Sequence, residues 1–161
     1  SSILIYLGES SRINLSYIIE DENGDYIELP LEEVDTWKPK IAIINVEGDL
    51  YFAAVEDLQN QIEQILDTGI EILILRFRRT HLLASTGIMA LDRLIKTAQE
   101  KDMKILFCGL REEVMEPLES AGITDKIGES NIFLADRRLF GSTQEALGRA
   151  KKILAEDLNN Q

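Results

Sequence analysis

Four segments of the chain are continuously apolar and rich in β-branched residues, instead of alternating between apolar and polar positions. This pattern is typical of strands that are covered on both faces, because neither set of side chains meets water. The four segments comprise residues 41–46, 70–77, 104–108 and 131–135. They predict an α/β domain with a mostly parallel central sheet of about four to six strands and helices on both sides.

Helical patterns lie between and after these segments, because apolar residues recur there every three or four positions. The predicted helices, about four in number, span residues 55–66, 88–98, 112–121 and 142–158. Gly122 suits the left-handed conformation that ends many helices. Ser142 and Glu145 form a capping-box pattern, which places the start of the last helix at Ser142.

The first 37 residues differ in character from the rest. Residues 13–20 and 25–29 flank an Asn-Gly pair, which favours a tight turn between two antiparallel strands. We therefore predict one domain in which residues 1–37 form an N-terminal β-hairpin extension and residues 38–161 form the core.

Composition narrows the class of protein. A chain of 161 residues with 45% hydrophobic content is expected to form one compact domain. The 17 basic and 29 acidic residues give a net charge of −12, so no nucleic acid partner is expected. With one cysteine, Cys108, and one histidine, His81, we expect a reduced chain without a metal or cofactor. No apolar run is long enough to span a membrane, and the chain begins with Ser1, so we expect a soluble piece cut from a longer protein.

The sequence predicts that the chain is not an enzyme. It has no Ser-His-Asp motif, no phosphate-binding loop of the Gly-x-x-x-x-Gly-Lys type and no dinucleotide fingerprint. Cys108 ends an apolar strand and is expected to be a small buried hydrophobe rather than a nucleophile. Glu112 and Glu113 fall at a predicted helix start, where acidic residues are favourable without any catalytic role.

Residues 82–88 read Leu-Leu-Ala-Ser-Thr-Gly-Ile, and this segment resembles the signature loop of STAS domains. These domains occur in anti-sigma-factor antagonists and in the cytoplasmic tails of sulfate permease (SulP) transporters. The family pattern is Asp-Ser/Thr-Ser/Thr-Gly before an apolar helix. Ser85, Thr86 and Gly87 match it, whereas Ala84 replaces the aspartate. Thr86 falls where the free-standing antagonists carry their phosphorylated hydroxyl.

Segments elsewhere extend the resemblance and favour its transporter branch. The matching segments include residues 48–53, 118–122, 131–133 and 139–142. The resemblance implies a STAS-type fold and a non-catalytic role in transport regulation and dimerisation. It also implies that the chain lies at the cytoplasmic side of the inner membrane, beside the transmembrane domain of the same transporter, which carries sulfate or bicarbonate. The alternative is a free-standing anti-sigma-factor antagonist that is switched by phosphorylation of Thr86.

The first candidate site is the segment Ser85, Thr86 and Gly87, between a predicted strand and a predicted helix. Its hydroxyls and free amides meet the positive end of the helix dipole, which favours a phosphate or another anion. The other interpretation is that Ser85 or Thr86 simply caps the helix. Because Ala84 removes the acidic neighbour, we expect that Thr86 is not a regulated phosphorylation site.

The second candidate site is a basic cluster of Arg76, Arg78, Arg79 and His81 at the end of a predicted parallel strand. Such strand ends often hold ligands. These residues either contact a ligand or partner, for example a nucleotide phosphate, or pair with local carboxylates. If these residues bind a nucleotide, the chain would be a small nucleotide-binding sensor.

The third candidate surface is the N-terminal hairpin. Its aromatic residues include Tyr6, Tyr17 and Tyr26. Because aromatic side chains are enriched at protein interfaces, they predict a homodimer contact.

Overall fold

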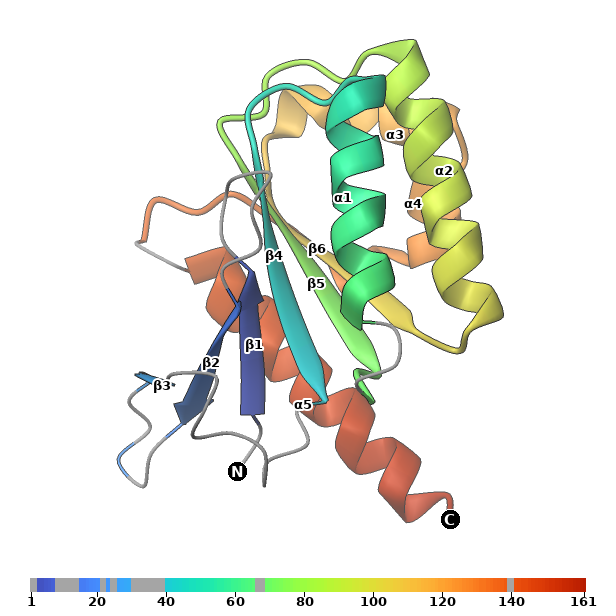
Figure 1. Ribbon diagram of the computed structural model, residues 1–161. Helices are drawn as coiled ribbons and strands as arrows, with labels where there is room; N and C mark the ends of the chain where they lie inside the picture. Colours follow the sequence, from blue (N-terminus) through green and yellow to red (C-terminus); the bar gives the residue numbers. More distant parts are fainter. Residues whose placement is uncertain are drawn as a thin grey trace.

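The computed structural model describes residues 3–7, 15–20, 23, 26–29, 40–65, 69–138 and 141–161. A seven-stranded sheet with the order β3-β2-β1-β4-β5-β6-β7 forms its centre (Figure 1). The strands are β1 (Ile3–Leu7), β2 (Leu15–Glu20), β3 (Tyr26–Leu29), β4 (Ile41–Glu47), β5 (Ile72–Arg78), β6 (Lys104–Leu110) and β7 (Ile132–Leu134). Strands β1, β4, β5, β6 and β7 run parallel, whereas β2 pairs with both of its neighbours in the antiparallel direction.

Helices cover both faces of this sheet (Figure 1). They are α1 (Phe52–Ile65), α2 (Ser85–Glu100), α3 (Met115–Ser120), α4 (Ile123–Ile127) and α5 (Gly141–Asn159), with short 3₁₀ turns η2 (Glu112–Val114) and η3 (Glu129–Asn131). Helices α1 to α4 pack on one face and α5 on the other. Ala42 and Ile44 of β4 face helices α1 to α4, while Ile41 and Ile43 belong to the core under α5. Successive strand residues point to opposite faces, and both sets are apolar because helices cover both faces.

The α/β fold and the four predicted strands are confirmed. The first three are buried as expected, whereas β7 is half-buried and its Leu134 is exposed. The hairpin is confirmed as well, because Tyr17 to Glu20 pair in antiparallel register with Leu29 to Tyr26. The structure adds β1, which joins the hairpin to β4 and raises the described strands to seven, above the expected range. Tyr6 lies in β1 and therefore outside the hairpin. Residues 30–39 lie outside the described residues, so the boundary after residue 37 stays a prediction.

The helices differ from the predictions at three points. Gly122 has a φ of +75°, as expected, but α4 follows it directly and gives five helices among the described residues instead of about four. The predicted third helix is divided between η2 and α3. The predicted capping box is wrong, because α5 begins at Gly141 and Ser142 lies inside its first turn. Glu145 instead accepts a hydrogen bond from the Arg138 guanidinium at 3.2 Å.

Candidate functional site

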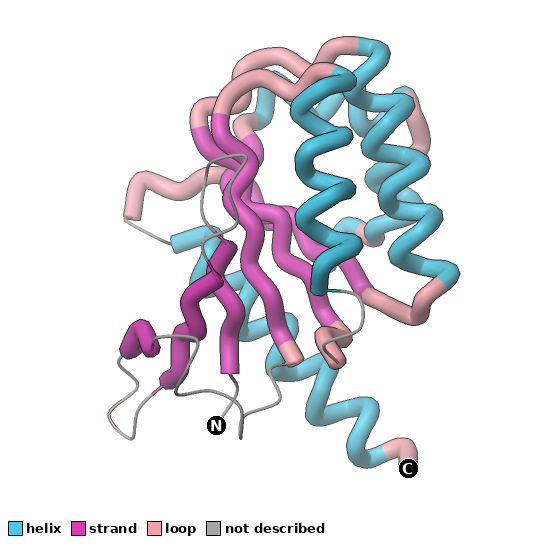
Figure 2. Tube along the Cα trace, viewed as in Figure 1, coloured by secondary structure: helices cyan, strands magenta, loops and turns pink. Residues whose placement is uncertain are grey.

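The carboxyl ends of β4, β5, β6 and β7 meet at one edge of the sheet, because these strands are parallel. The loops that follow β4 and β5 lead there into the first turns of α1 and α2 (Figure 2). Open parallel sheets commonly hold ligands at this edge. Two surfaces form on it, one beside α1 and α2 and one beside the start of α5.

The surface beside α1 and α2 is built by two loops that are joined through hydrogen bonds. Asp49 Oδ1 accepts bonds from the backbone amides of His81 at 2.9 Å and Leu82 at 3.0 Å. The Thr80 hydroxyl donates to the carbonyl oxygen of Gly48 at 2.9 Å. The bonds to His81 and then Leu82 lower the pKa of the Asp49 carboxyl below its ordinary value. We call the joined segments, residues 48–51 and 79–87, the signature loop pair.

Backbone hydrogen bonds also join the two loops. The Leu50 amide donates to the Leu82 carbonyl at 3.1 Å, and the Ala84 amide donates to the Leu50 carbonyl at 3.0 Å. Gly87 lies directly against the loop after β4, since a Cβ atom there would be 2.6 Å from the Leu50 carbonyl oxygen. The glycine of the signature is therefore required for the close approach of α2 to the loop after β4.

Ser85 and Thr86 are exposed in the first turn of α2. The N-cap residue is Ala84, and no side chain makes a hydrogen bond at the cap. The expectation that Ser85 or Thr86 caps the helix is therefore wrong. The physical reason is the bond between the Ala84 amide and Leu50, which fixes the chain so that the helix starts one residue after alanine. An anion or phosphate at Ser85, Thr86 and Gly87 stays a prediction.

Large apolar side chains are exposed on the signature loop pair and the helices that it starts. They are Tyr51, Phe52, Leu82 and Met89, which are 55%, 43%, 60% and 62% exposed. We call these four residues the apolar patch. Clusters of exposed apolar side chains that are held on a rigid support are typical of protein contact sites.

The surface beside α5 is a basic hollow of about 300 Å³. Six of the nine arginines of the chain line it: Arg76, Arg78, Arg79, Arg111, Arg137 and Arg138. Gly141, Ser142 and Thr143 from the first turn of α5 line it too. We call it the arginine hollow. Three of the four residues of the predicted basic cluster lie here, whereas His81 is elsewhere, with its Nδ1 3.2 Å from Glu113 Oε1.

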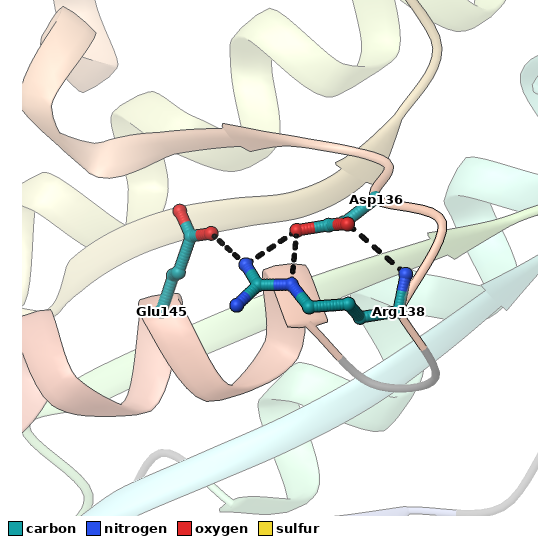
Figure 3. A network of polar contacts seen from close by, with 3 residues as sticks. All are labelled: Asp136, Arg138 and Glu145. Atoms are coloured by element: carbon teal, nitrogen blue, oxygen red, sulfur yellow. Dashed lines mark hydrogen bonds and ion pairs between the residues drawn. The ribbon is translucent and has the colours of Figure 1, made fainter.

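Three of these arginines pair with carboxylates. For Arg78 and Arg79 this agrees with one of the two interpretations of the basic cluster, whereas Arg138 was not part of that cluster. Glu47 lies 3.3 Å from Arg79 Nη1 and 3.9 Å from Arg78 Nε. Arg138 reaches between Asp136 and Glu145, as Figure 3 shows, with an Nε to Asp136 Oδ2 distance of 2.9 Å. Hydrogen bonds from the side chain and then the amide of Arg138 lower the pKa of Asp136 to about 2.

Arg111, Arg137 and Arg138 were missed by sequence reasoning. Arg111 follows β6, and Arg137 and Arg138 follow β7. The parallel order of β5, β6 and β7 brings them to the end of β5, which carries Arg76 and Arg78. In the part of the chain that the structure describes, no carboxylate pairs with Arg111 or Arg137. Two exposed guanidinium groups therefore remain available at this edge.

The remaining candidates lie away from these surfaces. Tyr6, Tyr17 and Tyr26 belong to the neighbouring strands β1, β2 and β3, and their role in a dimer stays a prediction. Cys108 is buried, as expected, and burial raises the pKa of its thiol to about 11. Across the described residues, no group of three or more His, Cys, Asp or Glu side chains could hold a metal ion. No helix within those same residues is long and apolar enough to cross a membrane.

A model of the STAS domain family matches residues 34–146. The chain belongs to the STAS domain family. High affinity sulfate transporter 1 of Stylosanthes hamata is 27% identical to it over 107 residues, which are 60% of this STAS domain and 16% of that transporter. This STAS domain thus spans less than a fifth of the length of that relative.

Solved structures agree with the family. The SulP transporter STAS domain of Vibrio cholerae has a TM-score of 0.58 and 28% identity, over 72% of this STAS domain and 85% of that one. A sulfate transporter family protein of Wolinella succinogenes has a TM-score of 0.63 over 84% of this STAS domain and 97% of that chain. At 19% identity, the second comparison shows the shared fold alone.

Proposed function

We propose that this STAS domain is the cytoplasmic, non-catalytic part of a SulP-type anion transporter and that it regulates transport of sulfate or bicarbonate. The observation that carries the proposal is the 28% identity to a SulP transporter STAS domain over 85% of that domain. The family match and the sulfate transporter of Stylosanthes hamata support the same assignment.

The signature loop pair would act as a contact surface for the transmembrane domain of the same transporter. Asp49, Thr80 and Gly87 join its two loops, so little conformational freedom would be lost on contact. The apolar patch on this support would supply the buried area. The N-terminal strands, which carry Tyr6, Tyr17 and Tyr26, would contribute to a homodimer.

The free-standing antagonist is the second candidate function, because Thr86 is exposed in the first turn of α2. A phosphate on Thr86 would meet the positive end of the helix dipole. We favour the transporter because Ala84 removes the acidic residue that the antagonists carry before this hydroxyl.

Transport by the complete gene product tests both the function and the contact surface. In a host without its own uptake system, we expect uptake of labelled sulfate or bicarbonate that falls severalfold in Met89→Glu. Leu158→Glu is the matched control, because Leu158 is 70% exposed near the end of α5, far along the chain from the apolar patch. Equal loss in both variants would contradict the contact surface, and no uptake of either anion by the unchanged protein would contradict the transporter.

A further inference from the structure

The arginine hollow concentrates positive charge in an acidic molecule. The whole chain carries a net charge of −12, yet six arginines line this one hollow. Glu47, Asp136 and Glu145 pair with Arg78, Arg79 and Arg138, which leaves the guanidinium groups of Arg111 and Arg137 without a carboxylate partner among the described residues. Asp136 is the one carboxylate among the described lining residues, so positive charge predominates, and a concave surface with a predominant charge attracts the opposite ion.

A second, larger hollow adjoins the first one. It measures about 720 Å³ and is lined by Leu110, Arg111, Glu112, Glu113, Leu134, Ala135, Asp136 and Arg137. Arg111 and Arg137 line both hollows, so they stand at the boundary between a basic space and a space with apolar walls. Leu134 and the carboxylates of Glu112 and Glu113 offer the second space an apolar surface and acceptors for hydroxyl donors.

The two hollows match the two parts of an organic phosphate. Guanidinium groups bind phosphate oxygens through paired, charge-assisted hydrogen bonds. The positive end of the α5 dipole favours the same charge, because Gly141 to Thr143 line the basic hollow, where the Gly141 amide donates to the Arg138 carbonyl at 3.1 Å. The carboxylate of Asp136 repels an anion, but its hydrogen bond with the Arg138 guanidinium reduces this repulsion. The volume of the basic hollow is at the lower end of the range for small-molecule sites, about 300–1,000 Å³.

We propose that Arg111 and Arg137 bind the phosphate group of a phosphate monoester, whose hydroxyl-bearing organic part lies in the larger hollow. Of the described residues that line the basic hollow, only Arg79 belongs to the signature loop pair, and the proposed site does not depend on the anion that the transporter carries. The phosphate monoester is either a soluble metabolite or a lipid headgroup, since both present the same group.

Binding to the 161-residue chain tests the proposal. The soluble probes are inorganic phosphate, adenosine monophosphate and adenosine, measured by calorimetry and by backbone amide shifts. Vesicles of phosphatidylcholine with and without phosphatidylinositol 4-phosphate, whose headgroup carries a phosphate monoester and free hydroxyls, test the lipid source. We expect adenosine monophosphate to bind more tightly than inorganic phosphate and adenosine not to bind, with amide shifts around Arg111 and Arg137.

Two variants locate the site. Arg111→Gln/Arg137→Gln is expected to weaken binding by about tenfold or more, because each removes a charge-assisted pair. Arg93→Gln is the matched control, since Arg93 is exposed on α2 and outside both hollows. Arg111→Lys/Arg137→Lys keeps the charge but loses the paired donors, so intermediate binding would separate the fork geometry from charge alone.

Each outcome decides between the sources or against the site. Binding only to vesicles that contain phosphatidylinositol 4-phosphate, and its loss in the Gln variant, would assign the site to a lipid headgroup. Binding of the soluble probe with the same loss would assign it to a metabolite. Equal binding by the Gln variant and the unchanged chain, or no binding to any phosphate probe, would overturn the proposal.

Discussion

The loop after β5 and the loop after β7 leave the same edge of the sheet, but different forces hold them. In the loop after β5, neutral backbone amides of His81 and Leu82 bond to Asp49, and Gly87 packs against Leu50. After β7, the side-chain contacts include ion pairs between Arg138 and two carboxylates, Asp136 and Glu145. One edge of a parallel sheet can therefore present a rigid apolar surface and a charged hollow at once.

The difference has consequences for how each surface responds to its surroundings. Close backbone packing excludes alternative conformations, so substitutions at the signature loop pair act on stability. Exposed ion pairs contribute little to stability and are weakened by salt. Substitutions at the arginine hollow are therefore expected to change binding and titration more than folding.

The largest expected effect comes from Gly87→Ala. The added Cβ would approach the Leu50 carbonyl oxygen to 2.6 Å, and the atoms that it meets are backbone. We expect a loss of about 2 kcal/mol in the free energy of unfolding, because overpacking outweighs the better helix propensity of alanine. Urea denaturation measures the change.

Gly148→Ala is the matched control for this substitution. Gly148 lies inside α5, and a Cβ atom there meets nothing within 4 Å. The free energy of unfolding of this variant is expected to rise by about 0.5–1 kcal/mol because alanine has the higher helix propensity. A gain in both variants would show that α2 does not pack tightly on the loop after β4.

A smaller effect is expected from Ala84→Asp, which introduces a carboxylate at the N-cap of α2. Ala84 has the extended conformation of an N-cap residue but no side chain to accept a bond. We expect a gain of about 1 kcal/mol in the free energy of unfolding, measured by urea denaturation. Ser85→Ala should change it by less than about 0.5 kcal/mol. A larger cost from Ser85→Ala would mean that Ser85 does act as the cap.

The titration of two aspartates gives the finest test of the contrast. The pKa of Asp136 is about 2, and the pKa of Asp49 is also below the ordinary aspartate value of 3.8. Both carboxylates therefore stabilise the folded state fully above pH 3.8, and this stabilisation is lost as the pH falls through each folded-state pKa. High salt should raise the pKa of Asp136 more than that of Asp49, because it screens the guanidinium of Arg138.

Carboxyl carbon shifts in NMR titrations at low and high salt measure both values. Arg138→Gln should bring the pKa of Asp136 towards 3.8 and leave that of Asp49 unchanged. Equal salt effects on the two carboxyls would remove the distinction between the surfaces.

Most of the sheet could be predicted because its strands carry their own signal. Residues 41–46 are apolar at every position except Asn45, which is the mark of a strand that is buried on both faces. The same signal is present in β1 (Ile3–Leu7), a continuous apolar run that the set of predicted strands does not include. Helix α4 (Ile123–Ile127) has only 5 residues, too few for a helical period to be recognised.

The functional surfaces were predictable only where their residues are neighbours in sequence. Arg76, Arg78 and Arg79 stand out as a cluster, whereas Arg111 and Arg137 are separated from them and from each other by whole elements. A usable signal existed, because both follow the ends of predicted parallel strands, which must meet at one edge. The cap of α2 was not predictable, since its position depends on the contact of Ala84 with Leu50.

The assignment to a transporter is tested most directly by the size and location of the protein in its native cell. An antibody against this STAS domain would be used on membrane and soluble fractions. We expect one membrane-bound protein several times larger than 18.2 kDa, without phosphate on Thr86. A soluble protein of about the size of this chain, with Thr86 phosphorylated in intact-mass analysis, would contradict the transporter assignment and favour the antagonist switch.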